Sequence, residues 1–299
     1  MRGFRLRRAP GRRWLASMLA ALCVGAAAAG VAAADASRPE AGASARPIRV
    51  LTWNVLAPSP LEQLLGLVVE TAGTARARAL LRQAKALDPD VVALQEVTGG
   101  FMAVLAESTD WPGYHASAEG SSAPPGGLLV LSRYPFVKVA YRRLPSPSGR
   151  QALFATLDLG TETLVVANAH LESLREYRTA REAQIAFMQD RLPRRGFTVW
   201  LGDFNFGDQD PETAQIALWT DAWPRLRPGE LGFSYDREAN PLARGHAFAA
   251  EPSRRLDRIL STPRLVPVAV GLIGQNDPPS DHYGVWADLV PSPASAPAP

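Results

Sequence analysis

Residues 197–205 read FTVWLGDFN, a short run of apolar and β-branched residues followed at once by glycine, aspartate and asparagine. A run of this composition predicts a buried β-strand at 197–201, with the polar residues of GDFN at its end. The stretches 48–54 (IRVLTWN), 90–95 (DVVALQ) and 163–169 (TLVVANA) have the same character. Polar motifs at the ends of comparable strands favour a layered sheet protein, in which rigid strands deliver side chains to one rim.

Further strands are predicted at 127–131, 151–159, 255–260 and 285–290, and helices at 61–87, with a break near Gly73, and at 175–192. Many strands and few helices indicate an α+β or α/β sandwich. Residues 48–290 are long enough for one domain, and the 46% hydrophobic content is enough for a core, which excludes a wholly disordered chain.

The N-terminus predicts a targeting segment. Residues 2–13 contain six arginines and no acid, residues 14–34 carry no charge, and Ala32-Ala33-Ala34 offers a cleavage site. We expect a signal peptide at 1–34, a flexible leader at 35–47 and a disordered tail at 291–299. Export to the periplasm or the medium follows, and an uncleaved membrane anchor is the alternative.

Composition narrows the possible functions. One cysteine excludes a disulfide framework and a cysteine-rich zinc site. The formal charge of +3 comes from 32 basic and 29 acidic residues, and six of the basic residues lie within 1–34. Without that segment the balance is 26 basic against 29 acidic residues, or −3, which gives no net attraction to nucleic acid.

Six motifs carry the chemistry. They are Trp53-Asn54, Gln95-Glu96, His170-Leu171-Glu172-Ser173, Gly202-Asp203-Phe204-Asn205, Arg255-Leu256-Asp257 and Ser280-Asp281-His282. Amides, carboxylates and imidazoles without a thiolate suit Mg²⁺ or Mn²⁺ rather than zinc. Histidines beside such a cation can neutralise phosphoryl oxygens or move protons. The set therefore predicts metal-assisted hydrolysis of a phosphate ester.

Each motif alone also has an ordinary structural explanation. A Gly-Asp pair after a strand is commonly a turn or a helix cap, and a histidine after an apolar run is commonly a half-buried, hydrogen-bonded residue. The arginines Arg175, Arg178 and Arg181 are spaced as one helix face, which is more often solvated than a binding stripe. The combination of all six motifs in one chain favours the functional interpretation.

The motifs TWN, LQEV, HLES, GDFN, RLDRI and SDH occur in the order typical of the endonuclease/exonuclease/phosphatase superfamily, which this chain resembles over residues 48–290. The resemblance implies a DNase I-like fold, a four-layered α/β sandwich with two central, mostly antiparallel sheets. It also implies a Mg²⁺-dependent hydrolase of phosphate esters.

The resemblance implies a role for each matching residue. Glu96 is expected to be the principal metal ligand, with Asn54 beside it and Asp281 helping to hold the metal or its water. Asp203 and Asn205 are expected to orient and deprotonate the attacking water. His170 and His282 are expected to bind the phosphate from two sides, with Asp257 fixing the tautomer of His282.

The HLES motif and the segment Pro279–His282 look most similar to the 5′-tyrosyl-DNA phosphodiesterase branch, although that branch often has an arginine where this chain has Gly207. Ser173 and Tyr235 are expected to contact the substrate, Tyr235 by stacking. The expected substrate is a nucleic acid or, alternatively, a phospholipid headgroup as in sphingomyelinases. A monomer without an obligate protein partner is expected, and a non-catalytic binding module on this fold is the remaining alternative.

Overall fold

The computed structural model describes residues 46–57, 69–245 and 251–292. The predicted signal peptide, most of the predicted leader and residues 293–299 of the predicted tail lie outside these ranges. Within them, no helix combines the length and the apolar character that crossing a membrane requires.

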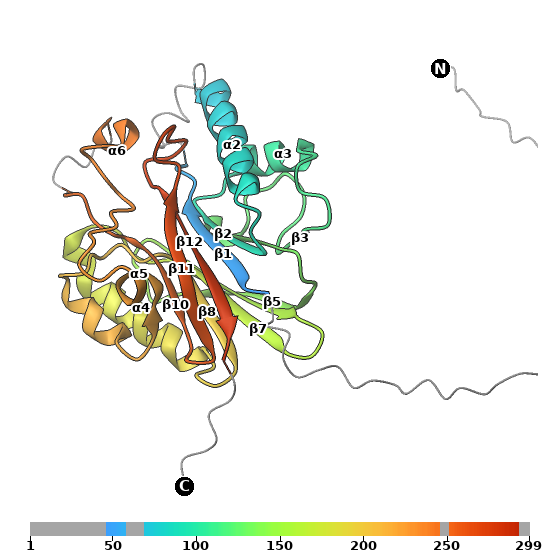
Figure 1. Ribbon diagram of the computed structural model, residues 1–299. Helices are drawn as coiled ribbons and strands as arrows, with labels where there is room; N and C mark the ends of the chain where they lie inside the picture. The colour runs from blue at the N-terminus through green and yellow to red at the C-terminus, as the bar shows by residue number, and fades with distance from the viewer. Residues whose placement is uncertain (1–45, 58–68, 246–250, 293–299) are drawn as a thin grey trace, which may run out of the picture. The chain divides into compact units, whose positions relative to one another are not determined.

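Two six-stranded sheets form the centre of the described chain (Figure 1). The first has the order β11-β12-β1-β2-β4-β3 and the second the order β5-β6-β7-β8-β10-β9. The strands of the first sheet are β1 (Ile48–Asn54), β2 (Val91–Gln95), β3 (His115–Ala116), β4 (Leu129–Ser132), β11 (Leu265–Ile273) and β12 (Gly284–Pro291). Those of the second are β5 (Phe136–Arg143), β6 (Gln151–Asp158), β7 (Thr163–His170), β8 (Phe197–Asp203), β9 (Thr220–Asp221) and β10 (Asp257–Ser261).

Each sheet contains one parallel pair, β1–β2 in the first and β7–β8 in the second, and all its other pairs are antiparallel. The expected sandwich of mostly antiparallel sheets is therefore confirmed. A parallel pair matters for the site because both of its strands end at the same edge of the sheet.

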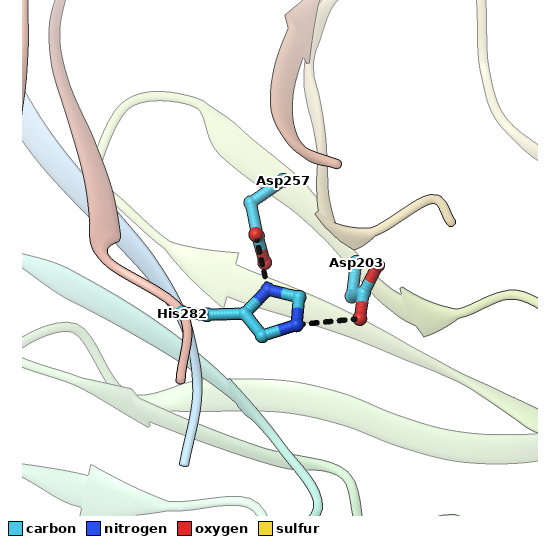
Figure 2. Close-up of side chains that lie close together, drawn as sticks. All are labelled: Asp203, Asp257 and His282. Atoms are coloured by element: carbon cyan, nitrogen blue, oxygen red, sulfur yellow. Dashed lines mark hydrogen bonds and ion pairs between the residues drawn. The ribbon is translucent and has the colours of Figure 1, made fainter. Parts of the chain in front are cut away.

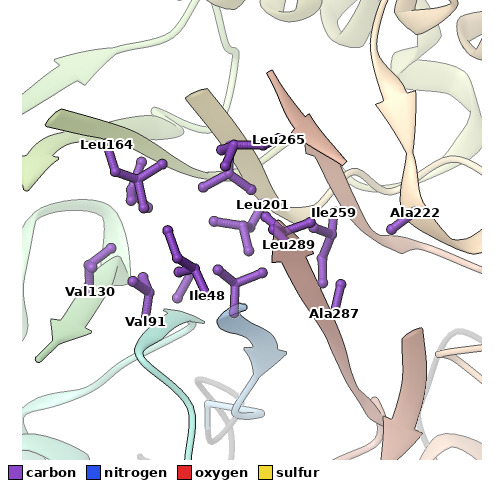
Figure 3. Close-up of a cluster of buried hydrophobic side chains, with 14 of the residues drawn as sticks. Ile48, Val91, Val130, Leu164, Leu201, Ala222, Ile259, Leu265, Ala287 and Leu289 are labelled. Carbon is purple, nitrogen blue, oxygen red and sulfur yellow. The ribbon is translucent and has the colours of Figure 1, made fainter. Parts of the chain in front are cut away.

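The two sheets pack face to face through alternating residues. On β1, Ile48 and Val50 join the cluster between the sheets, whereas Leu51 and Trp53 point to the opposite face. Figure 3 shows part of the central cluster, in which Ile48 and Val91 from one sheet meet Leu164 and Leu201 from the other. The period of two follows from the pleat, which sends successive side chains to opposite faces.

Helices form the outer layers. α2 (Val69–Ala86) and α3 (Gly99–Glu107) pack on the first sheet, and α4 (Arg178–Arg191) packs on the second. Two short helices, α5 (Ala222–Leu226) and α6 (Pro241–Gly245), and three 3₁₀ turns at Pro125–Gly127, Arg175–Tyr177 and Pro211–Ile216 complete the described elements. The expected four layers are present.

The sequence-based prediction missed two long strands and misplaced some boundaries. β5 and β11 lie at sheet edges, and β11 has a bulge beside Pro267, so neither shows a regular buried pattern. Helix α2 runs through Gly73 without a break. Pro291, predicted to open the tail, is the last residue of β12 and pairs with Leu265.

Candidate active site

The parallel strand pairs place four of the motifs at one rim of the sandwich. Asn54 pairs with Gln95 at the ends of β1 and β2, and His170 pairs with Asp203 at the ends of β7 and β8. Glu96 follows β2 directly. The carboxyl ends of neighbouring parallel strands lie at the same edge of the sheet, so residues far apart in the sequence become neighbours.

The other two motifs, which contain Asp257 and His282, lie at the start of a strand rather than at its end. Asp257 is the first residue of β10 and pairs with Asp203, because β10 runs antiparallel to β8. His282 lies just before β12, and its carbonyl oxygen accepts a 2.9 Å hydrogen bond from Trp53 Nε1. Ser280 Oγ donates to the carbonyl oxygen of Asn54 at 2.6 Å. Antiparallel strands thus begin at the rim where their partners end.

Gly202 is required where β8 approaches β7. Its φ is 142°, and a Cβ at this position would overlap the carbonyl oxygen of Ala169 on the neighbouring strand. The glycine therefore allows the close approach that sets Asp203 beside His170.

Asp203 lies at the centre of the site, almost fully buried. Its Oδ2 is 3.4 Å from His170 Nε2, 3.8 Å from His282 Nε2 and 3.2 Å from Asn54 Nδ2, which donates to it. Its Oδ1 accepts from the backbone N–H of Asn205 at 2.9 Å. One carboxylate oxygen is fixed by the backbone, and the other faces both imidazoles.

His282 is paired with two carboxylates. Its Nδ1 lies 2.7 Å from Asp257 Oδ2, and its Nε2 faces Asp203, as Figure 2 shows. Burial alone lowers the pKa of His282, but the charges of Asp257 and Asp203 and the hydrogen bond to Asp257 outweigh burial and hold the pKa well above its usual value. His282 is therefore an imidazolium near neutral pH.

His170 has the opposite character. Burial lowers its pKa well below the usual value, and the positive charges of Arg150 and His282 lower it further. The 3.4 Å approach to Asp203 is consequently a contact between a neutral imidazole and a carboxylate, not an ion pair. The site thus presents one charged and one neutral imidazole on either side of Asp203.

The pKa of Asp203 is raised to about 6, chiefly by burial and also by the charge of Asp257, against the lowering effects of His282 and of the hydrogen bonds from Asn54 and Asn205. A carboxylate with a raised pKa is a stronger base than an ordinary aspartate and still ionised at neutral pH. Asp203 is suited to accept a proton.

Glu96 lies beside this centre in a constrained conformation. Its φ is +61°, unusual for a residue with a side chain. Its Oε1 accepts from Asn54 Nδ2 at 3.0 Å, and its Oε2 accepts from the backbone N–H of Ala57 at 2.8 Å. Within the described ranges no arginine, lysine or histidine pairs with the Glu96 carboxylate. A partly buried carboxylate without a counter-ion fits a cation ligand.

A second set of groups also has the spacing of a cation site. Asp203, Asp257 and His282 offer ligand atoms within 4.8 Å of one another, and Asp257 Oδ1 is buried without a hydrogen-bond partner among the described residues. These three residues therefore have the spacing of a cation site with acidic and histidine ligands. The 2.7 Å separation of His282 Nδ1 and Asp257 Oδ2 is a hydrogen-bond distance, which commits that nitrogen to a proton.

The other predicted site residues, Asn205, Asp281 and Ser173, lie near this centre. Asn205 donates from Nδ2 to the carbonyl oxygen of Leu171 at 3.0 Å, and Asp281, buried, lies between Ser280 and His282. Ser173 accepts from Arg150 at 2.8 Å.

Tyr235 does not offer an open face for stacking on a substrate. It is 6% exposed, its ring packs against the ring of His282 with centroids 5.3 Å apart, and its hydroxyl donates to the carbonyl oxygen of Ala243 at 3.3 Å. Tyr235 packs against the ring of His282 instead, so the structure does not support the expected stacking on a substrate.

Sequence reasoning missed Arg150 and misjudged Arg181. Arg150 follows a Ser-Pro-Ser-Gly turn, and only its basic character beside a predicted strand hinted at a role. Arg181, predicted on a solvated face, is buried: it pairs with Glu212 at 2.8 Å and donates to the carbonyl oxygens of Glu172 and Leu174. It anchors the backbone that follows His170 rather than forming a basic stripe.

Comparisons with known proteins identify the family of the chain and structures that share its fold. Tyrosyl-DNA phosphodiesterase 2 of Gallus gallus is 26% identical over 237 residues, which cover 70% of this chain and 60% of that protein. The chain thus matches less than two thirds of this curated relative.

Two solved structures share the fold. The D. rerio TDP2 complexed with single strand DNA product has a TM-score of 0.64 at 23% identity, covering 81% of this chain and 98% of that one. Sphingomyelinase C from Streptomyces griseocarneus has a TM-score of 0.61 at 20% identity, covering 81% and 99%. The model of the Endonuclease/Exonuclease/phosphatase family, whose members hydrolyse phosphoester bonds, matches residues 51–282, and the chain belongs to this family.

Proposed function

We propose that the chain is a divalent-cation-dependent phosphodiesterase that hydrolyses a P–O bond by in-line attack of water. The observation that carries this proposal is the position of Asp203 Oδ2 between the Nε2 atoms of His170 and His282. Water held by Asp203 there would have a base on one side and two donors for phosphoryl oxygens beside it.

Four side chains have distinct roles in this reaction. Asp203, with its raised pKa, accepts the proton of the attacking water. His282, charged and held by Asp257, donates from Nε2 toward a non-bridging oxygen on which negative charge develops. His170, neutral, donates a second hydrogen bond. Asp257 stabilises the imidazolium and fixes its orientation.

Mg²⁺, or Mn²⁺, is the proposed cation, and Glu96 with Asn54 and Asp281 would hold it. Hard oxygen donors suit these ions, and Glu96 has no charged partner among the described residues, whereas the alternative set uses a nitrogen already bonded to Asp257. When bound, the cation supplies positive charge that stabilises the phosphoryl oxygens and the leaving group.

The proposed substrate is a nucleic-acid end, with a 5′-phosphotyrosyl group as the first candidate. The curated relatives are tyrosyl-DNA phosphodiesterases, and the D. rerio structure holds a single-strand DNA product. The guanidinium of Arg150, close to His170 and without a carboxylate partner among the described residues, adds positive charge for a phosphodiester. A phospholipid headgroup is the competing substrate, which the substrate panel below distinguishes.

The first experiment measures hydrolysis of bis-p-nitrophenyl phosphate with Mg²⁺ or Mn²⁺ and after EDTA. We expect activity that EDTA abolishes and added cation restores. Asp203→Asn, His170→Gln and His282→Gln should each lower kcat by roughly a hundredfold or more. The matched control is His115→Gln, since His115 is exposed on β3 and should leave kcat unchanged. Activity that persists in EDTA, or in both Asp203→Asn and His282→Gln, contradicts the proposal.

The second experiment compares kcat/KM on 5′-phosphotyrosyl DNA, unmodified single-stranded DNA, sphingomyelin and an inositol phosphate. The proposal expects the DNA substrates to be hydrolysed fastest. A preference for sphingomyelin would replace the nucleic-acid assignment and keep the chemistry. Absence of hydrolysis together with tight DNA binding would instead support a non-catalytic binding module.

We also propose that the protein is exported through residues 1–34. Six arginines precede an uncharged run that ends in small residues, which is the anatomy of a secretory signal. Fractionation of a bacterial host should find the full chain processed and outside the cytoplasm, and a chain lacking residues 2–34 retained inside. Full-length protein in the membrane fraction would favour the anchor instead.

A further inference from the structure

Arg150 connects the loop between β5 and β6 to the end of β7. Its Nη1 lies 2.9 Å from His170 Nδ1, and its Nη2 donates to Ser173 Oγ at 2.8 Å. The two atoms it contacts belong to the HLES motif, one of them on the imidazole that faces Asp203. The contact is therefore directed at the site, although Arg150 belongs to none of the six motifs.

This contact decides which nitrogen of His170 carries the proton. A guanidinium has five N–H donors and no acceptor, so His170 Nδ1 must be the acceptor in the pair. In a neutral imidazole the proton then resides on Nε2, the nitrogen 3.4 Å from Asp203 Oδ2. The opposite tautomer would place two donors against each other at Nδ1 and leave Nε2 without a proton to donate.

The loop that carries Arg150 is itself tied to the same motif. Ser146 Oγ donates to Glu172 Oε2 at 2.5 Å and accepts from the backbone N–H of Arg150 at 2.9 Å. The backbone of Glu172 is fixed in turn, since its N–H donates to Gln184 Oε1 and its carbonyl oxygen accepts from Arg181. Both partners of the Arg150–His170 contact are thus attached to the same hydrogen-bonded segment.

The two imidazoles of the site have opposite partners at Nδ1. His282 faces the carboxylate of Asp257, which requires a proton on Nδ1. His170 faces a cation, which requires a lone pair there. Among residues 46–57, 69–245 and 251–292 no carboxylate lies within ion-pair distance of Arg150, so the contact with His170 is not a by-product of a salt bridge.

We propose that Arg150 is a positioning residue that fixes the Nε2–H tautomer of His170. His170 then always presents an N–H toward the space beside Asp203. The proposed function places a phosphoryl oxygen in that space, and the role of this N–H rests on the proposed function. Arg150 at Nδ1 thus orients the neutral donor His170, as Asp257 at Nδ1 orients the charged donor His282.

The test is the tautomeric state of His170, read from long-range ¹H–¹⁵N correlations in protein labelled with ¹⁵N in its imidazoles. His170→Gln assigns the resonances by removing them. Wild-type protein should show the Nε2–H pattern for His170, and Arg150→Lys, which keeps a cationic donor, should preserve it. Arg150→Glu puts an acceptor opposite Nδ1 and should convert His170 to the Nδ1–H pattern. An Nδ1–H pattern in the wild type, or an unchanged Nε2–H pattern in Arg150→Glu, overturns the proposal.

Two checks keep the result interpretable. The His282 and His115 resonances should stay in place in each variant, which shows that the fold is retained. If Arg150→Glu does not fold, Arg150→Met removes the donor while keeping the side-chain stem, and we expect a mixture of both tautomers. A pure Nε2–H pattern in Arg150→Met contradicts the proposal.

An activity arm separates this inference from the proposed function. Arg150→Met should lower kcat on bis-p-nitrophenyl phosphate by about 10- to 100-fold, as the loss of a partner that orients a metal-bound histidine does, and Arg150→Lys should recover part of the loss. Arg142→Met, at an exposed arginine on β5, is the control. An inactive wild-type protein with the expected tautomers contradicts the proposed function alone, whereas an active one with the wrong tautomer contradicts the role of Arg150 alone.

Discussion

Asp257 Oδ2 lies 2.7 Å from Nδ1 of His282, and both side chains are buried at the rim of the sandwich. The pair connects the first residue of β10 with the loop that precedes β12, so it joins the two sheets at the site. Because the carboxylate of Asp257, together with that of Asp203, raises the pKa of His282, Asp257 supports the charge on which the proposed role of His282 depends.

Replacing Asp257 tests this relationship. Asp257→Asn keeps the shape of the side chain but removes its charge, so the pKa of His282 should fall and kcat should drop by at least roughly a hundredfold. The measurement is kcat with Mg²⁺ on bis-p-nitrophenyl phosphate. Asp277→Asn, at an exposed aspartate, is the matched control and should leave kcat unchanged. Equal kcat values for the two variants contradict the assigned role.

The pH dependence of activity follows from Asp203 and His282. Asp203 must be ionised to accept a proton, and burial raises its pKa to about 6, so kcat/KM should rise with pH through that value. His282 must be protonated, and its pKa is held well above 6.5, so activity should fall again only on the alkaline side. The profile of kcat/KM from pH 4.5 to 10 checks both limbs, and a value at pH 5 equal to that at pH 7.5 contradicts the role of Asp203.

Gly202 should tolerate no side chain. Gly202→Ala introduces a Cβ that overlaps the carbonyl oxygen of Ala169 at a positive φ, so we expect a loss of stability above about 4 kcal/mol or no folded protein. Gly196→Ala is the control, because Gly196 also has a positive φ but open space where a Cβ would lie, and it should cost only about 1 kcal/mol. Urea unfolding measures both. Similar midpoints for the two variants would show that the close approach is not required.

An ionic cluster around a fully buried arginine supports the loop that follows Asp203. Arg258, fully buried, donates to Asp221 at 2.8 Å, to Asp208 at 3.0 Å and to the carbonyl oxygen of Phe206 at 3.1 Å. Arg258→Met leaves the two carboxylates with less positive charge and should destabilise the fold by about 3 kcal/mol.

The control for this change is Arg78→Met, which breaks an exposed pair with Glu107 and should cost less than about 1 kcal/mol. Chemical denaturation of the three proteins under one set of conditions gives both differences. If Arg258→Met is no more destabilising than Arg78→Met, the cluster does not stabilise the loop.

Much of the site could be predicted from local sequence. Asn54, Glu96, His170 and Asp203 end or follow buried strands with regular apolar composition, and such strands form where the pattern predicts them. Edge strands were harder to predict, because β5 and β11 bury only part of their residues and the alternation weakens. Arg181 was misjudged because helical spacing shows which face a residue occupies but not what covers that face.

The sequence by itself determined the buried central strands and the residue types that can do phosphoester chemistry, since apolar periodicity and turn residues act over short distances. Tertiary structure alone decided the charge states and the partners. His170 and His282 are the same residue type, yet one faces Arg150 and the other Asp257. Because those partners arrive from different sheets and loops, only packing brings them within hydrogen-bond distance, and that packing makes one imidazole neutral and the other charged.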